Sequence, residues 1–183
     1  MDAKYVIFSI LVCLWCASVE TARYPRASGE LVINIKGFDN CTKEGKGLIR
    51  WIGSKMKFSR HSDPSFTGLM HLGFPLTNNG TTPVKLTTYF LQNGGYKMLF
   101  KSERKSIFEL LNNLSPKMME GLMTCFNTTT QYLPPGEHTC TNWIMHPIKR
   151  QLPIVIKSKG YCTIDFYKNS SLMGCFKMLF DIN

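Results

Sequence analysis

Alternating apolar and polar positions predict a chain built mostly of β-strands. Leu31, Ile33 and Ile35 fall on one face of a strand, because successive side chains in a strand point to opposite sides of a sheet. The same two-residue period predicts further strands over 48–58, 84–90, 96–100, 137–145, 161–167 and 172–180. Asn93-Gly94-Gly95 predicts a hairpin turn, since asparagine and glycine supply the positive φ that tight turns need. The last strand is apolar on both faces, which favours a central place in a sheet.

A helical period follows the strand at 96–100 and predicts one short helical segment. Its first part has apolar residues at positions i, i+3, i+4 and i+7, namely Ile107, Leu110, Leu111 and Leu114. Ser115 and Pro116 suit a second helix start, because serine can cap free amides and proline fits the first helical position. The second part presents Met118, Met119, Leu122 and Met123 on one face. Residues 59–79, rich in polar residues, glycine and proline, predict a loop with one short strand near 68–72.

The first 22 residues have the pattern of an export signal. An apolar run over 5–17 is about a dozen residues long, whereas a spanning helix needs about 20. Cleavage after Ser18 leaves small residues at the last and third-last positions, Ser18 and Cys16, whereas cleavage after Ala22 is a weaker alternative because Glu20 would be third-last. We expect a signal peptide over 1–22, a loose leader over 23–29, and a single secreted, extracellular domain over 30–183.

Five of the seven cysteines remain after such a signal is removed, namely Cys41, Cys125, Cys140, Cys162 and Cys175. A bond between Cys41 and Cys175 would close a loop of about 130 residues and tie the first strand to the last. Cys140 and Cys162 lie in strands that could face each other, which predicts a second bond there. Cys125 is then left without a partner.

Sequons for N-glycosylation occur at Asn40, Asn79, Asn113, Asn127 and Asn169. Asn79, Asn127 and Asn169 lie in polar loops and are predicted to carry sugar. Asn40 and Asn113 are poorer acceptors, because a cysteine fills the middle of the first sequon and Pro116 follows the second.

Charge and motifs argue against nucleic-acid binding and against enzyme chemistry. The net charge of +10 comes from dispersed lysines and arginines, which is typical of a solvated basic surface; attraction to anionic membranes or receptors is the functional alternative. We find no nucleophile elbow, zinc-binding helix, phosphate loop or Cys-x-x-Cys pair. No catalytic residue, metal or cofactor is expected.

An apolar connection over 143–156 is the first candidate functional segment. It contains Trp143, Ile144 and Ile154 among other apolar residues, whereas most loops are polar. Such a segment either plugs the core or forms the rim of a ligand cavity. The core plug is the simpler interpretation; the ten methionines and twelve phenylalanines support the second, since flexible thioethers suit a cavity that adapts to hydrocarbon chains.

Several short motifs together resemble one known family. They are Phe38-Asp39-Asn40-Cys41, Phe108-Glu109-Leu110-Leu111, Pro134-Pro135-Gly136-Glu137-His138, Leu152-Pro153, Gly160-Tyr161 and Gly174-Cys175-Phe176-Lys177. They resemble the ganglioside activator-like branch of the MD-2-related lipid-recognition superfamily. With the run Tyr89-Phe90-Leu91-Gln92-Asn93-Gly94-Gly95-Tyr96-Lys97, the pattern is most similar to the insect CheB chemosensory proteins.

The resemblance implies a mostly β fold: a β-cup, or immunoglobulin-like sandwich, of two antiparallel sheets around an apolar cavity. It implies a Cys41–Cys175 bond and the absence of catalytic residues. The family's cysteine in the helical region has no counterpart near 106–111, which agrees with an unpaired Cys125. The Cys140–Cys162 bond has no counterpart in the family.

The function that follows is a secreted, monomeric carrier of a lipid or hydrophobic small molecule, with a cuticular hydrocarbon or a fatty-acid-derived pheromone as ligand. Such a carrier takes hydrocarbon out of water at about 0.8 kcal/mol per methylene. We expect a cavity of several hundred cubic ångströms lined by Phe90, Met98, Phe100, Leu110, Leu111, Met118, Leu122, Trp143, Ile144, Ile154, Ile164 and Phe176. The alternative is an accessory module of a sensory or innate-immune receptor with a filled core. A hydrolase is a distant third.

Overall fold

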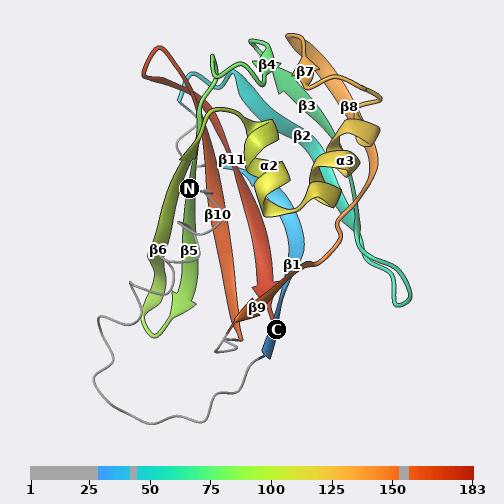
Figure 1. Ribbon diagram of the computed structural model, residues 1–183, viewed down its shortest axis with the longest axis vertical. Coiled ribbons are helices and arrows are strands. Elements are labelled where there is room, and N and C mark those ends of the chain that lie inside the picture. The colour runs from blue at the N-terminus through green and yellow to red at the C-terminus, as the bar shows by residue number, and fades with distance from the viewer. Residues whose placement is uncertain (1–28, 42–44, 153–156) are drawn as a thin grey trace.

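The strands predicted from the alternating pattern form two layers in the computed structural model, which describes residues 29–41, 45–152 and 157–183 (Figure 1). The predicted signal peptide and all but the last residue of the leader lie outside the described residues. The strands are β1 (Gly29–Asn40), β2 (Ile49–Lys57), β3 (Ser65–Leu72), β4 (Leu76–Thr77), β5 (Val84–Gln92), β6 (Gly95–Arg104), β7 (Tyr132–Leu133), β8 (Gly136–Ile144), β9 (Ile148–Leu152), β10 (Ser158–Lys168) and β11 (Ser171–Ile182). The helices are α2 (Ile107–Leu114) and α3 (Pro116–Cys125).

The larger sheet has six antiparallel strands in the order β6-β5-β10-β11-β1-β9. The last strand, β11, pairs with both β10 and β1, which confirms its predicted central place. Inward residues of neighbouring strands lie opposite one another; Ile164, for example, is opposite Leu86 on one side and Phe176 on the other. This side of the sheet forms one wall of the core.

The second layer is a three-stranded antiparallel sheet, β2-β3-β8, beside a two-stranded ribbon, β4-β7. The short strand predicted near 68–72 is confirmed but is longer than expected, because β3 covers eight residues and is the middle strand of this sheet. Phe66, Met70 and Leu72 point into the core while exposed or half-buried polar residues alternate with them. The connection after Trp143 also contains a strand, β9, which pairs with β1.

The two helices lie one after the other over the space between the sheets (Figure 1). At the start of α2 the Ser106 hydroxyl accepts a hydrogen bond from the Glu109 amide at 3.1 Å, and the Glu109 carboxylate accepts one from the Lys105 amide at 3.1 Å. This pair is a variant of the capping box, in which the carboxylate bonds the amide of the residue before the N-cap instead of the N-cap itself. Pro116 begins α3 as predicted, although the Ser115 side chain makes no capping bond. Both helices bury an apolar face against the sheets.

Two disulfides cross-link the fold, one within the large sheet and one between α3 and the small sheet. Cys41 and Cys175 are bonded, which joins the end of β1 to β11 as predicted. The second predicted bond is wrong: Cys125 bonds Cys140, and Cys162 is a free, buried thiol. The reason is that β8 belongs to the small sheet whereas β10 belongs to the large one, so Cys140 and Cys162 are not cross-strand neighbours. Helix α3 instead packs on β8, with the Cα atoms of Cys125 and Cys140 4.7 Å apart.

Neither helix in the described part of the chain has the length and apolar character needed to cross a bilayer. Two disulfides are compatible with an exported protein, because such bonds persist in oxidising compartments.

Candidate ligand site

One small apolar cavity lies where both sheets and both helices converge. Its volume is about 20 Å³, which is room for about one water-sized group. Twelve residues from ten strands and helices line it: Phe38, Trp51, Met70, Leu76, Ile107, Leu111, Leu122, Leu133, Trp143, Ile164, Phe166 and Phe176. None of these side chains is charged, so the only strong hydrogen-bonding groups they carry are the two indole N–H groups.

Aromatic side chains fill the space that the sequence predicted to be open. The Phe38 ring stacks on Trp143 with centroids 5.5 Å apart and meets Phe66 edge-on at 4.9 Å. Trp51 packs on the other side of Phe66 at 4.7 Å. The expectation of a cavity of several hundred cubic ångströms is therefore not met in this ligand-free structure, because large rings from both layers interdigitate between the sheets.

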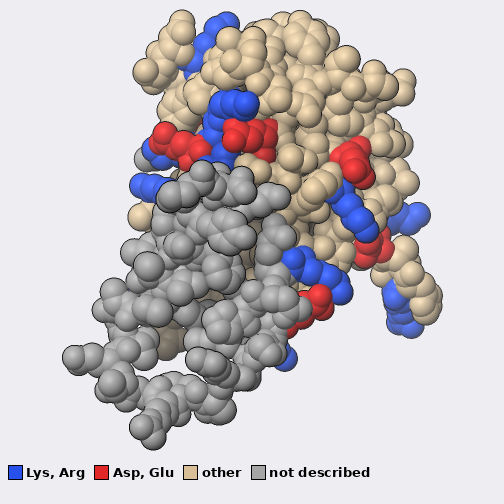
Figure 2. Space-filling model, viewed as in Figure 1, with Lys and Arg blue, Asp and Glu red and all other residues tan. Residues whose placement is uncertain are grey.

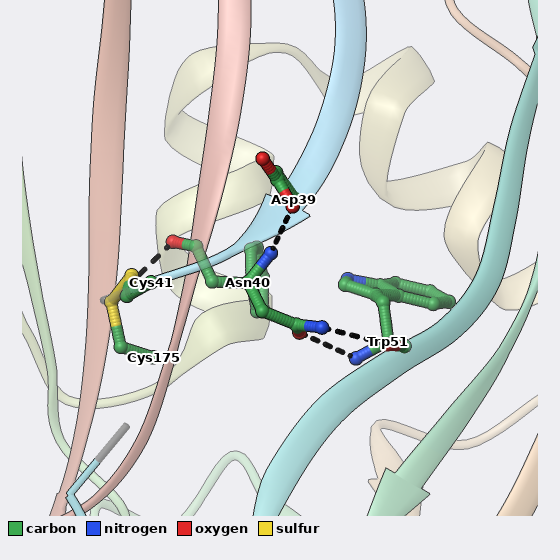
Figure 3. Close-up of a disulfide and its surroundings, with 6 residues drawn as sticks. Asp39, Asn40, Cys41, Trp51 and Cys175 are labelled. Carbon is green, nitrogen blue, oxygen red and sulfur yellow. Dashed lines mark hydrogen bonds between the residues drawn. A yellow bond between two sulfur atoms is a disulfide. The ribbon is translucent and has the colours of Figure 1, made fainter. Parts of the chain in front are cut away.

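The side chain of Asn40 holds the backbone of Trp51 through two hydrogen bonds (Figure 3). The Asn40 Nδ2 group donates to the Trp51 carbonyl at 2.9 Å, and the Trp51 amide donates to Asn40 Oδ1 at 3.0 Å. Strand β2 is the outer strand of its sheet, so Asn40 takes the place of a missing neighbour strand. The next residue, Cys41, forms the disulfide to β11, which anchors the end of β1 to its neighbour in the large sheet.

Trp143 lies under α3 at the one position where the helix has no side chain. A Cβ atom built on Gly121 would lie 2.7 Å from both Cδ1 and Nε1 of Trp143. Only glycine therefore lets the helix approach the indole this closely. The N–H edge of the ring faces the bare backbone of α3.

Both indole N–H groups are buried without a partner among the described residues. Trp51 is 4% exposed and Trp143 is 3% exposed. Buried polar groups in native proteins are nearly always hydrogen-bonded, and leaving one unpaired costs about 1–3 kcal/mol. Neither N–H group faces the cavity, which exposes no polar atom; that of Trp143 lies against α3 at Gly121.

Five of the predicted site residues line this cavity: Leu111, Leu122, Trp143, Ile164 and Phe176. Leu110 and Met118 are buried in the core but do not line the cavity. Phe90 and Phe100, on β5 and β6, are partly buried and pack against the core. Ile144 is half-buried beside Trp143. Ile154 lies outside the described residues. The structure thus brings together the predicted residues of the helices and central strands, but not those of the β5–β6 hairpin.

Met98 does not belong to the site, and its prediction as a ligand contact is wrong. Its side chain is 52% exposed. A register shift between Thr88 and Tyr89 places Phe100 opposite Thr88 but Met98 opposite Tyr89. Because this β-bulge interrupts the alternation, Met98 and Phe100 point to opposite faces of the sheet.

Sequence reasoning missed seven of the lining residues: Phe38, Trp51, Met70, Leu76, Ile107, Leu133 and Phe166. Trp51 and Phe166 sit at inward positions of predicted strands, so the alternating pattern carried a signal for them. Met70 and Leu76 fall in the segment predicted to be mostly loop, where no such signal was recognised.

Among the described residues, the ionisable and sulfur-containing side chains do not form a second reactive or metal-binding site. Burial raises the pKa of the Cys162 thiol to about 12, which makes it a poor nucleophile. His146 Nδ1 lies 2.6 Å from Asp63 Oδ2, a pair that joins the β2–β3 hairpin to the chain after β8. Asp165 lies beside Cys41 and Cys175, but these two sulfurs are bonded to each other and are not thiolates.

The three predicted glycosylation sites, Asn79, Asn127 and Asn169, all have exposed side chains. Asn40 differs, because both polar atoms of its amide are bonded to the Trp51 backbone. A sugar on Asn40 would disturb the corner shown in Figure 3.

Comparison with protein-family models and with curated proteins gives no match for this chain. The function proposed for this protein therefore depends on the geometry of the site and on the motif resemblance.

Proposed function

We propose that this protein is a secreted carrier of a small apolar molecule, which binds between the two sheets beneath α2 and α3. The observation that carries the proposal is the wall of the central cavity, which twelve apolar side chains from both sheets and both helices form and which exposes no polar atom. Such a lining suits an apolar molecule, because nothing on it can pair with a polar or charged group.

Ligand binding on this proposal requires the cavity to enlarge. Small-molecule sites hold about 300–1,000 Å³, far above the present volume of about 20 Å³. The aliphatic part of the wall, with Met70, Leu111 and Leu122 among its members, can change rotamer around the fixed aromatic rings. Each methylene that enters contributes about 0.8 kcal/mol, so a chain of a dozen carbons offsets a substantial opening cost.

The motif resemblance to the ganglioside activator-like branch supports the same proposal, since the members of that branch are lipid binders. Its CheB-like features favour a cuticular hydrocarbon or a fatty-acid-derived pheromone presented to sensory neurons. In this role the protein acts by burial and release, without catalysis, metal or cofactor.

Native mass spectrometry of the protein secreted by eukaryotic cells tests the proposal. We expect a mass increment from co-purifying lipid, which solvent extraction then identifies. Leu122→Phe enlarges a side chain on the cavity wall and should lower the occupied fraction, whereas Leu91→Phe, at an exposed position, should not. A chain that stays empty, and that takes up no added lipid, contradicts the carrier function.

A second candidate is an accessory module of a membrane receptor, and the filled core is the observation that favours it. Its docking surface would be the β5–β6 hairpin, where Leu91, Tyr96, Met98 and Leu99 are exposed large apolar residues and Lys97 and Lys101 are exposed between and beside them. On the face shown in Figure 2, by contrast, acidic and basic side chains are interspersed and form no single patch. An empty protein whose cell-surface binding is lost with Tyr96→Ser but kept with Leu122→Phe would support this alternative.

A further inference from the structure

Two β-hairpins, β2–β3 and β5–β6, project from the same end of the molecule, opposite the end where the ribbon β4–β7 lies (Figure 1). The Ser158 hydroxyl at the start of β10 donates to the Leu91 carbonyl of β5 at 3.3 Å. On the other side, Lys36 Nζ of β1 lies over the Phe58 ring, which directly follows β2, at 5.7 Å from its centroid. The hairpin end, as we call this part of the protein, comprises residues 29–36, 55–65, 91–99, 146–149, 157–160 and 180–183.

Basic side chains greatly outnumber acidic ones at the hairpin end. Eight lysines and arginines are exposed there: Lys36, Lys55, Lys57, Arg60, Lys97, Lys149, Lys157 and Lys159. The three acidic residues are each paired with a basic one, at nitrogen–oxygen distances of 2.6–3.6 Å: Glu30 with Lys149, Asp63 with His146 and Asp181 with Lys36.

Six cations of the hairpin end therefore have no acidic partner among the described residues. The two helices differ, because the charged residues they carry are one lysine, Lys117, and two glutamates, Glu109 and Glu120. Basic side chains are also visible at the tip of the β2–β3 hairpin, at the lower right of Figure 2. The surplus of positive charge is thus concentrated at one end of the molecule.

Large apolar side chains are exposed at the same end. In the described part of the chain, seven such side chains are exposed, and five of them flank the two hairpin turns: Phe58, Leu91, Tyr96, Met98 and Leu99, each 44–56% exposed. Contiguous exposed apolar groups commonly mark an interaction site. Lysines adjoin them in sequence, because Lys57 precedes Phe58 and Lys97 lies between Tyr96 and Met98.

Apolar tips surrounded by lysines suit the surface of an anionic bilayer. Apolar side chains enter the boundary between headgroups and acyl chains, while lysine stems lie along them and the ammonium groups stay among the headgroups. Each lysine or arginine near an anionic surface strengthens binding about fivefold. A fluid lipid surface also accommodates two separate projecting turns, whereas a folded protein partner would need a surface matched to both.

We propose that the hairpin end docks this protein on an anionic lipid surface, with Phe58 and Tyr96 entering the headgroup region and the surrounding lysines pairing with acidic headgroups. This interaction goes beyond the carrier function and does not depend on it. None of the residues that line the central cavity belongs to the hairpin end.

Co-sedimentation of the secreted protein with vesicles tests the proposal. One set of vesicles contains phosphatidylcholine alone, and the other contains about 30% phosphatidylserine as the anionic lipid. We expect at least about tenfold stronger binding to the anionic vesicles. Raising the salt concentration from about 0.1 M to about 1 M shortens the Debye length from about 10 Å to about 3 Å, and should remove most of that preference.

Charge variants locate the contact. Lys57→Gln and Lys97→Gln each remove one cation, from different hairpins, and each should weaken binding to anionic vesicles about fivefold. Lys117→Gln removes the same charge from an exposed position on α3, outside the hairpin end. This control should bind within about twofold of the unmodified protein.

Two exposed tyrosines give a matched test of the apolar contact. Tyr96 is 50% exposed at the hairpin end, and Tyr132 is 47% exposed on β7 at the opposite end. Tyr96→Ser should weaken binding to anionic vesicles about threefold or more, because it removes an apolar ring from the interface. Tyr132→Ser should leave the binding unchanged.

Equal binding to the two kinds of vesicle, or binding to neither, overturns the proposal. Protein that ignores vesicles but still binds cells through the same lysines would assign the hairpin end to an acidic protein partner instead. Equal losses for Lys57→Gln and Lys117→Gln overturn it as well, since net charge alone would then explain the binding. None of these results bears on the carrier function, because vesicle binding does not report the occupancy of the central cavity. Where a variant does not fold, the comparison of the two vesicle compositions on the unmodified protein still decides.

Discussion

The side-chain amide of Asn40 makes both of its hydrogen bonds to the backbone of Trp51, at 2.9 and 3.0 Å. It satisfies the outward N–H and C=O of the outer strand β2 and fixes one of the two tryptophans at the cavity. Asn40→Ala should lower the free energy of unfolding by about 1–3 kcal/mol, because it leaves two backbone groups unpaired in a partly buried corner. Urea denaturation measures the change.

Asn112→Ala serves as the control, since Asn112 is exposed on α2 and alanine suits a helix. We expect that control to lie within about 0.5 kcal/mol of the unmodified protein. Glycopeptide mapping should also find Asn40 without sugar. A fully glycosylated Asn40 in the folded protein would show that the bonds to Trp51 do not form.

The backbone of α3 at Gly121 lies close against the Trp143 ring of β8. In most helices glycine to alanine gains about 1 kcal/mol. Gly121→Ala should instead lose about 1–3 kcal/mol, because its Cβ would lie 2.7 Å from two atoms of a ring that is packed against Phe38. Thermal unfolding measures the sign, with Lys117→Ala as an exposed control on the same helix. A stabilised Gly121→Ala variant would mean that the ring is free to move aside.

Disulfide mapping checks the correction to the predicted pairing. We expect non-reducing digestion to yield one peptide linked through Cys41 and Cys175 and another linked through Cys125 and Cys140. Cys162 should be alkylated only after denaturation, because it is buried. A peptide that links Cys140 to Cys162 would contradict the placement of β8 and β10 in different sheets.

Local patterns predicted the strands, the hairpin, the central place of β11 and the paired helices, because these depend on periodicity and turn residues close in sequence. The pattern of β3 was obscured by Gly68, which has no side chain at an inward position, and by Leu69, which is apolar on the opposite face. The second disulfide was mispredicted for a different reason. Which sheet β8 joins depends on pairing with β3, a contact distant in sequence that no local period reveals.

The size of the cavity was also beyond sequence reasoning. Composition shows that large apolar side chains are present, but whether they line a space or fill it depends on how they interdigitate. Here the rings of Phe38, Phe66 and Trp143 all pack against one another, and that packing was invisible in the sequence. The alternation did indicate which residues point inward, which is why five of the predicted ligand contacts lie on the cavity wall.

Met118 and Met98 allow a matched comparison, because both were predicted to contact the ligand but only Met118 is buried. Met118 on α3 is fully buried, whereas Met98 on β6 is 52% exposed. Met118→Ala should cost about 2–5 kcal/mol, because it removes buried methylenes and leaves a cavity. Met98→Ala should change the stability by no more than about 0.5 kcal/mol. Equal losses for the two variants would place Met98 in the core after all. Chemical denaturation under identical conditions gives both values.

Cys162 gives the protein an alkaline limit to its stability. Burial raises the pKa of its thiol from 9.0 to about 12 in the folded state. Between these values the unfolded chain loses the proton and the folded chain keeps it, so rising pH favours unfolding. The stabilising effect is complete below pH 9 and is lost towards pH 12. From pH 8 to pH 10 the unmodified protein should lose about 1.3 kcal/mol more than Cys162→Ala, in which this group is absent. Lysines and tyrosines titrate in both proteins, so their contribution cancels when one pH dependence of the unfolding free energy is subtracted from the other. Parallel pH dependences would show that the thiol is not shielded from water, and with it that β10 is not packed against the core as described.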